Sequence, residues 1–222
     1  MLDNIEFSIS LIRHGQSEVN VCPNIIGQGS DVKLTELGKQ QAFLLGKRFD
    51  REGIVFDHVY SSTYLRALDT AKISLADFKN NIIEVEELRE YDCGDWKGHD
   101  RKETLNNDIR LKMGYLNMAF MPPNGETQNM VERRASNWLE NTILYNDTFH
   151  SLCKYRKDTG NSPMNIAVYS HGVTIRCLLH YVAGFDRTFL WKIDIDNTSI
   201  SKLSFNRFGW RICSINDCGH LK

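Results

Sequence analysis

The sequence predicts an α/β fold, a three-layer sandwich with a mainly parallel central sheet and helices on both faces. Short apolar runs alternate along the chain with longer segments whose apolar residues recur at helical spacing. This alternation is typical of parallel strands that are joined by crossover helices. The 222 residues include 41% hydrophobic and 25% charged residues, which is ordinary globular composition. We expect a single domain over residues 1–222.

The predicted strands are short runs rich in aliphatic and aromatic residues. In the first of them, Ile5, Phe7, Ile9 and Leu11 alternate with mostly polar residues, as in a strand with one buried face. The last two strands are separated by a turn at residues 206–209 and form a hairpin. We expect strands over residues 5–12, 54–62, 82–85, 166–169, 198–205 and 209–215.

The predicted helices carry apolar stripes, and one begins at a clear capping residue. Thr35 is that N-cap, and Leu37, Leu45 and Phe49 follow it on one side of a helix. We expect helices over residues 35–51, 64–78, 127–145 and 173–182, and weak helical character over 100–118. Prolines, glycines and polar runs predict loops over residues 13–33, 86–99, 121–125 and 155–163.

Charge and cysteine content exclude several classes of function. The formal net charge is −1, so no global positive field attracts nucleic acid. The six cysteines form no CxxC pair and are too few for a disulfide framework. The N-terminus lacks the apolar stretch of a signal peptide, and no apolar run approaches the roughly 18 residues that span a membrane. We expect a cytoplasmic protein with reduced thiols that binds neither nucleic acid nor membrane.

Polar residues mark the ends of three predicted strands. Arg13 and His14 follow the first strand, two serines end the second at residues 61–62, and Ser170 and His171 follow the run over 166–169. Ligands of open α/β sheets bind outside the carboxyl ends of the strands. A glycine follows each of the two histidines. The sequence therefore predicts that the fold brings these strand ends together around a phosphate.

The chemistry of a phosphate monoester suggests a role for each of these residues. Arg13 and Arg66 carry planar guanidinium groups that can each pair with two phosphate oxygens. His14 can attack phosphorus through a neutral ring nitrogen. His171, and the backbone amides that open the helix after Gly172, can donate hydrogen bonds to the phosphate oxygens.

The reaction also needs an acid that protonates the departing alkoxide, with a pKa raised toward neutrality. Glu90, in the irregular segment over residues 86–99, is the candidate. Other carboxylates lie close in sequence, among them Glu87 and Asp92, so this assignment has local competitors.

Six stretches of the chain resemble the histidine phosphatase superfamily, also called the phosphoglycerate mutase-like family, and they occur in the family's order. They are residues 11–20, 34–38, 61–71, 88–98, 124–127 and 170–172. The resemblance implies that His14 carries the phosphoryl group as a phosphohistidine and that Glu90 donates the proton. It further implies that the phosphate is bound by Arg13, Asn20, Arg66, His171 and Gly172. The resemblance implies no metal and no other cofactor.

Within this family the chain is more similar to the broad phosphatase branch than to the glycolytic mutases. Mutases carry a longer insertion after the proton-donor motif, whereas here residues 91–122 separate that motif from the next. Lys33, where relatives often have proline, and the glycine-rich 27–31 loop are departures from the family pattern. The resemblance implies a metal-independent phosphatase of small phosphorylated metabolites. A phosphoglycerate mutase and a non-catalytic phosphate-sensing module are the alternatives.

The sequence leaves two further questions open. It does not identify the physiological substrate, because the walls of the pocket come from loops. It also does not decide between a monomer and a homodimer.

Overall fold

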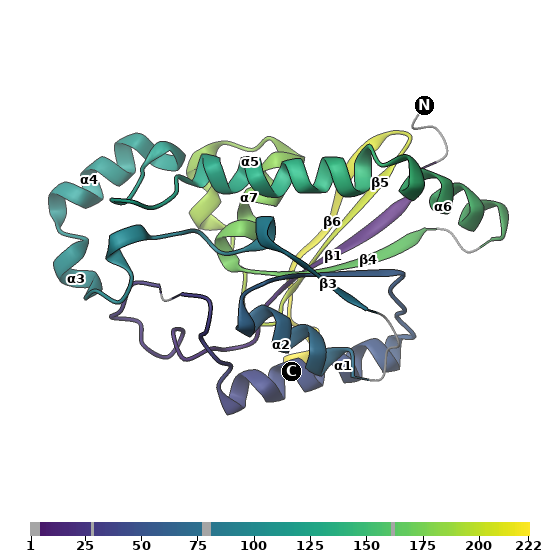
Figure 1. Ribbon diagram of the computed structural model, residues 1–222, viewed down its shortest axis with the longest axis horizontal. Helices are drawn as coiled ribbons and strands as arrows, with labels where there is room; N and C mark the ends of the chain where they lie inside the picture. The colour runs from purple at the N-terminus through teal and green to yellow at the C-terminus, as the bar shows by residue number, and fades with distance from the viewer. Residues whose placement is uncertain (1–4, 28, 77–80, 161–162) are drawn as a thin grey trace.

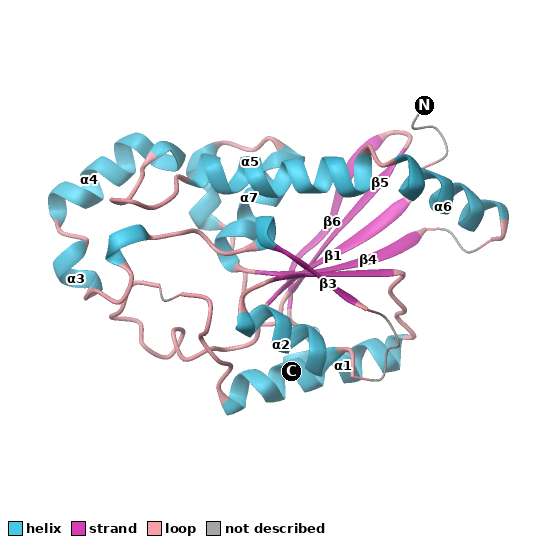
Figure 2. Ribbon diagram, in the orientation of Figure 1, coloured by secondary structure: helices cyan, strands magenta, loops and turns pink. Residues whose placement is uncertain are grey.

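The computed structural model describes residues 5–27, 29–76, 81–160 and 163–222. A six-stranded sheet lies between two layers of helices (Figures 1 and 2). The strands are β1 Phe7–Arg13, β2 His58–Ser62, β3 Ile82–Val85, β4 Met164–Ser170, β5 Ile200–Asn206 and β6 Gly209–Asp217. The helices are α1 Glu36–Glu52, α2 Leu65–Ser74, α3 Arg101–Thr104, α4 Asn107–Leu116, α5 Gln128–Leu139, α6 Asp147–Asp158 and α7 Gly172–Ala183.

The strand order is β3-β2-β4-β1-β5-β6. The first four strands in this order are parallel, whereas β5 pairs antiparallel with β1, and β6 pairs antiparallel with β5. The predicted α/β sandwich, its mainly parallel sheet and the closing hairpin are thus confirmed. β1 and β4 pair in register from Phe7 opposite Met164 to Arg13 opposite Ser170. Their carboxyl ends therefore meet at the same edge of the sheet.

Helices cover both faces of the sheet and form two apolar cores. Figure 1 shows α5 and α7 on one side of the sheet and α1 and α2 on the other. Side chains of β4 alternate between the two cores. Ile166 and Val168 pack in the core beneath α5 and α7, whereas Ala167 and Tyr169 pack in the core beneath α1 and α2. The continuous apolar sequence of β4 follows from burial on both faces.

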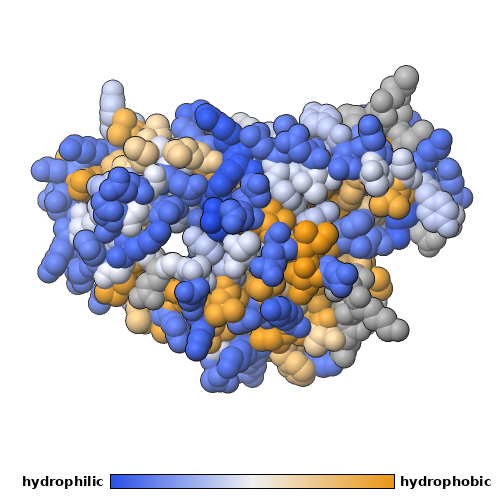
Figure 3. Space-filling view, in the orientation of Figure 1, coloured by the Kyte–Doolittle hydropathy of each residue, from blue (hydrophilic) through white to orange (hydrophobic). Residues whose placement is uncertain are grey.

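The surface is mixed, as expected for a protein of this composition. Figure 3 shows hydrophilic residues over most of one face, with hydrophobic residues gathered near its middle, around the edge strand β3. Ile83 of this strand is 46% exposed. Short edge strands limit pairing with other chains, and β3 has four residues. Over the described ranges, none of the helices has the length and apolar character needed to cross a membrane.

The helices differ from the sequence prediction at four places. The helix predicted over 127–145 is α5 as far as Leu139 and then a π-helical segment over Glu140–Leu144. α2 ends at Ser74, before the predicted end at residue 78, which lies outside the described residues. The weakly helical segment over 100–118 contains two helices, α3 and α4, because Asp100 and Asn106 each cap a new N-terminus. The predicted loop from residue 155 to 163 is wrong in its first part, since α6 continues to Asp158.

α6 has a weak sequence signal because it buries little. Its N-cap is Asn146, whose side chain accepts a hydrogen bond from the amide of Phe149 at 3.0 Å. The buried residues of the helix are Phe149 and Cys153. Two apolar positions four residues apart do not make a stripe that stands out in a polar sequence.

α1 packs closely against the loop that follows β1. Gly38 is on its buried side, whereas Leu37, which the sequence places in the apolar stripe, is 48% exposed. A side-chain carbon at Gly38 would lie 1.9 Å from the carbonyl oxygen of Gln16. One at Gly15 would lie 2.6 Å from the carbonyl oxygen of Gly38. The backbone next to His14 therefore reaches α1 because both positions lack a side chain.

Gly38→Ala is expected to lower the free energy of unfolding by about 1–3 kcal/mol, because the added methyl group overlaps the Gln16 carbonyl. Urea denaturation measures the change. Gly114→Ala in α4 is the matched control, since a side-chain carbon there has no neighbour within 4 Å. Alanine is favoured over glycine in a helix by roughly 0.5–1 kcal/mol, so this control should be neutral or stabilising. Equal effects at the two positions would contradict the close packing.

Candidate active site

The ends of β1 and β4 bring the two His-Gly turns together. Arg13 is the last residue of β1 and lies opposite Ser170, the last residue of β4. His14 and His171 follow directly, and their ring centroids are 5.2 Å apart. His14 is 3% exposed and His171 is fully buried. The structure therefore contains the juxtaposition that the strand-end pattern predicts.

Hydrogen bonds set the orientation of the His14 ring. Its Nδ1 lies 2.7 Å from the carbonyl oxygen of Gly15, which can only accept, so Nδ1 carries the ring hydrogen. The lone pair is then on Nε2, to which Nε of Arg66 donates at 3.3 Å. Burial, and then the charges of Arg66 and Arg13, hold the pKa of His14 well below its usual value. The ring is therefore neutral near pH 7, with a nucleophilic nitrogen at Nε2.

Two arginines, of which Arg66 is buried and Arg13 is partly buried, place positive charge beside His14. Arg66 lies in the first turn of α2, is 5% exposed, and donates from Nη1 to the carbonyl oxygen of Gly29 at 3.2 Å. Arg13 donates from Nη1 to the carbonyl oxygen of Ile195 at 2.6 Å. The Nε of Arg13 is buried without a hydrogen-bond partner. Buried donors are normally paired, so this one suits an oxygen of a bound anion.

His171 has one paired and one unpaired ring nitrogen. Its Nε2 lies 2.8 Å from the hydroxyl of Ser62, which also accepts from the amide of Tyr64 at 3.2 Å. The hydroxyl hydrogen of Ser62 is then free to donate to Nε2, which places the ring hydrogen on Nδ1. Nδ1 is buried and lacks a partner. Burial, followed by the charge of Arg66, holds the pKa of His171 well below its usual value.

The carboxylate of Glu90 caps the N-terminus of α7. Its Oε1 accepts from the amides of Tyr91 at 3.0 Å and Thr174 at 3.3 Å, and its Oε2 accepts from the amide of Val173 at 3.3 Å. The sequence assigns the amides after Gly172 to a phosphate, but in this structure Glu90 occupies those of Val173 and Thr174. A side-chain carbon at Gly172 would lie 3.2 Å from Nη1 of Arg176, so the glycine leaves room for that guanidinium group.

Asn20 stabilises the loop that carries His14. Its Oδ1 accepts from the amide and the hydroxyl of Ser17, both at 3.0 Å, and from Nδ2 of Asn197 at 3.2 Å. The same Asn197 group donates to the carbonyl oxygen of His14 at 3.0 Å. The sequence does not predict this role of Asn197, because 183 residues separate it from His14 and no local pattern marks it.

A cavity of about 320 Å³ opens at these strand ends. Five of the predicted site residues line it, namely Arg13, His14, Asn20, Arg66 and Glu90. His171 and Gly172 are not part of this lining, and His171 contacts the site through the buried His14 ring. The side chains predicted to bind the phosphate therefore lie together at one end of the cavity.

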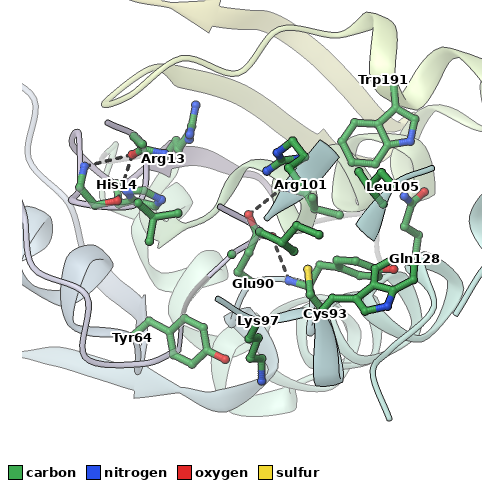
Figure 4. Close-up of a pocket in the computed structure, with 18 of the residues that line it drawn as sticks. Arg13, His14, Tyr64, Glu90, Cys93, Lys97, Arg101, Leu105, Gln128 and Trp191 are labelled. Atoms are coloured by element: carbon green, nitrogen blue, oxygen red, sulfur yellow. Dashed lines mark hydrogen bonds between the residues drawn. The ribbon is translucent and has the colours of Figure 1, made fainter. Parts of the chain in front are cut away.

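The rest of the cavity wall is largely apolar and comes mostly from the segment over residues 91–122. Trp96 and Phe120 both line it, with ring centroids 5.6 Å apart. In Figure 4 Leu105 and Trp191 lie at the end opposite the histidine. Figure 1 shows α3 and α4 projecting beyond the sheet on this side.

Two cations of the wall are absent from the sequence-based site. Lys97 pairs with Asp92, with Nζ 2.6 Å from Oδ1. Arg101 donates from Nε to the carbonyl oxygen of Pro23 at 3.0 Å, which joins this segment to the loop after β1. Both line the cavity (Figure 4). Lys97 lies within one of the family-like motifs, which could have indicated it, whereas Arg101 has no such signal.

The arrangement suits the transfer of a phosphoryl group. A neutral imidazole nitrogen, two guanidinium groups and a carboxylate surround one end of the cavity, where the buried Nε of Arg13 lacks a partner. The unpaired Nδ1 of His171 belongs to the neighbouring ring outside the lining. Cations and unpaired N–H donors bind phosphate oxygens. In the part of the chain that the structure describes, no group of three or more His, Cys, Asp or Glu side chains is placed to hold a metal ion.

The model of the histidine phosphatase superfamily (branch 1) matches residues 9–218. The chain belongs to this superfamily. The match extends from β1 through the last strand, so it includes every element that contributes to the cavity. The family resemblance of the six sequence motifs is confirmed.

Relatives within the histidine phosphatase superfamily include both mutases and phosphatases. The chain is 35% identical over 139 residues to the 2,3-bisphosphoglycerate-dependent phosphoglycerate mutase of Parvibaculum lavamentivorans. This alignment spans 60% of the chain and 66% of that mutase, just under two thirds of its length. An enzyme of the same name from Bartonella tribocorum is 30% identical over 184 residues, which are 81% of this chain and 82% of that one.

A solved structure with a similar fold is a variant of phosphoserine phosphatase from Entamoeba histolytica in complex with phosphoserine. It matches with a TM-score of 0.76 and 26% identity, over 97% of this chain and 100% of that one. Membership in the superfamily therefore fixes the fold, while the named relatives differ in the reaction they catalyse.

A buried neutral His14 predicts stability that falls in acid. Its folded-state pKa lies below the unfolded value of 6.5, so the unfolded chain binds more protons as the pH drops below 6.5. We expect the wild type to lose more free energy of unfolding between about pH 7.5 and about pH 5 than His14→Asn does. Urea denaturation at the two pH values measures both losses. Equal losses in the two proteins would contradict a neutral buried imidazole.

Proposed function

We propose that this protein is a metal-independent phosphatase that hydrolyses phosphate monoesters of small metabolites through a phosphohistidine at His14. The observation that carries the proposal is the His14 ring itself. It is buried and neutral, with its hydrogen fixed on Nδ1 and its Nε2 lone pair facing Arg66. A nucleophile and a phosphate-binding cation therefore meet at one point of the cavity.

The first step transfers the phosphoryl group to the enzyme. Nε2 of His14 attacks phosphorus, a nitrogen–phosphorus bond forms, and the bond to the leaving oxygen breaks. Arg13 and Arg66 offset the charge of the phosphate oxygens. A protonated Glu90 gives its proton to the leaving oxygen, which departs as an alcohol.

The second step returns the enzyme to its starting state. Water attacks the phosphohistidine, the nitrogen–phosphorus bond breaks, and inorganic phosphate forms. The Glu90 carboxylate takes one proton from the attacking water, and His14 regains its neutral ring. The two steps together consume one water for each ester hydrolysed.

The cavity supports a small substrate with a partly apolar body. Its volume of about 320 Å³ lies at the lower end of the range for small-molecule sites. Trp96, Phe120 and Leu105 form an apolar wall away from the histidine end. The related phosphoserine phosphatase, bound to phosphoserine, gives an example of a small phosphorylated metabolite in this fold.

A phosphoglycerate mutase is the second candidate, because two similar relatives carry that name. The short segment over residues 91–122 favours hydrolysis. It supplies two small helices, α3 and α4, as the cover of the cavity. A mutase must keep water away from its phosphorylated histidine, and a larger cover serves that purpose.

His14→Ala is expected to lower the rate of p-nitrophenyl phosphate hydrolysis by at least about a thousandfold, because the nucleophile is removed. The assay contains EDTA, and the wild type should keep its activity there. His99→Ala, at an exposed histidine outside the cavity lining, is the matched control and should resemble the wild type. Substantial activity in His14→Ala would contradict the nucleophile. Loss of wild-type activity in EDTA would contradict metal independence.

Incubation with 3-phosphoglycerate distinguishes the two candidate reactions. A phosphatase releases inorganic phosphate from this substrate or leaves it unchanged, and it forms no 2-phosphoglycerate. We expect no stimulation by 2,3-bisphosphoglycerate in a coupled assay for 2-phosphoglycerate. Clear stimulation would favour the mutase instead.

A further inference from the structure

The segment that carries Glu90 is held by side chains at four consecutive carbonyl groups. Over residues 87–90, the first and last carbonyl oxygens accept from Arg134, at 2.5 Å from Nη1 and 3.2 Å from Nη2. The second accepts from the hydroxyl of Ser170 at 2.7 Å, and the third from the hydroxyl of Thr174 at 2.6 Å. The segment has no regular sheet or helix partner at residues 89–90, so these side chains set its position.

Arg134 of α5 is itself held by a carboxylate. Its Nε and Nη2 donate to Oε1 and Oε2 of Glu126 at 2.9 and 3.0 Å, which makes the ion pair bidentate. Oε2 of Glu126 also accepts from the amide of Asp92 at 3.1 Å. The Arg134–Glu126 pair therefore forms hydrogen bonds with backbone groups on both sides of the Glu90 side chain. The two side chains are 18% and 21% exposed, so solvent screens the pair little.

Arg134 acts at a distance from the reacting groups. Of the described residues, those that line the cavity include Glu90 but not Arg134. Its contacts are with the backbone of the segment over 87–90 and with Glu126. A substrate in the cavity would therefore meet Glu90 and not the arginine that fixes it.

We propose that Arg134, held by Glu126, is the positioning residue for the proton donor Glu90. This role of Arg134 rests on the proposed phosphatase function. The fork of the guanidinium spans the carbonyl groups of residues 87 and 90 and thereby fixes where the carboxyl group of Glu90 reaches the leaving oxygen. A displacement of about 1 Å in such a group can reduce a rate about a hundredfold.

This role predicts a dependence on the leaving group. In the first step the proton of Glu90 moves to the leaving oxygen as the phosphorus–oxygen bond breaks. A dinitrophenolate leaves readily without that proton, whereas a benzyl alkoxide requires it. Loss of positioning should therefore slow benzyl phosphate and leave 2,4-dinitrophenyl phosphate nearly unaffected. A general loss of structure or of phosphate binding would slow both.

The test measures kcat/KM for both esters in the wild type, Arg134→Ala, Glu90→Gln and Arg133→Ala. For Arg134→Ala we expect a loss of about tenfold to a hundredfold with benzyl phosphate and of less than about threefold with the dinitrophenyl ester. Glu90→Gln should show the same selectivity with a larger loss. Arg133→Ala, at the exposed neighbour on α5, is the matched control and should resemble the wild type.

A double variant tests whether Arg134 acts through Glu90. In the Glu90→Gln background, Arg134→Ala should cause little further loss with benzyl phosphate, because residues that act as a unit are not additive. An equal loss of Arg134→Ala on the two esters, or a full additional loss in the double variant, would overturn the proposal.

Glu126→Gln is the second variant if Arg134→Ala does not fold, since it keeps the size of the side chain and removes the charge that holds the arginine. It should show a smaller loss with the same selectivity, and a wild-type ratio of the two esters would overturn the proposal. If the wild type hydrolyses neither ester, the phosphatase function itself is wrong, and that outcome is distinct from an unselective loss in the variants.

Discussion

The parallel pairing of β1 with β4 is the constraint on which the site depends. It places Arg13 opposite Ser170, so that the next residue of each strand is a histidine and the two rings lie together. β1 and β4 are far apart in the sequence, and the helices and strands between them must fold for the two to pair. The two histidines therefore come together only in the complete α/β fold. Both faces of β4 are buried, and its side chains alternate between two differently packed cores. A slip of one residue would move each side chain into the other core and disrupt both, so the register is fixed.

Burial then determines the chemistry of the paired rings. Two imidazoles and two guanidinium groups share a space with little solvent, and the arginines keep the charge while both histidines are held neutral. For His14 this leaves a lone pair on Nε2, and for His171 an unpaired N–H group on Nδ1. In a protein interior, positive charge without a counter-charge and N–H groups without an acceptor are both costly. A phosphate would supply the negative charge and the acceptor oxygens. This electrostatic arrangement is the physical basis of the proposed phosphate site.

Much of the fold and site could be predicted because the signals are local. His14 lies at the end of an alternating strand, and Arg66 lies in the first turn of a helix, so a short window of sequence reveals both. α6 was missed because its buried side is too small to give a helical period. Asn197 and Arg134 were missed for another reason. Each acts on backbone groups far away in sequence, and any residue type can supply a backbone carbonyl, so no pattern in the chain marks the contact.

Trapping the phosphorylated enzyme tests the central claim most directly. The protein is mixed with a phosphate ester that carries a labelled phosphoryl group, quenched within the first turnover, digested and mapped by mass spectrometry under conditions that preserve phosphohistidine. The account predicts an acid-labile phosphoryl group on His14, which decays as inorganic phosphate appears and is missing in His14→Ala. Turnover by the wild type without a phosphorylated intermediate, or with the phosphoryl group on another residue, would contradict it.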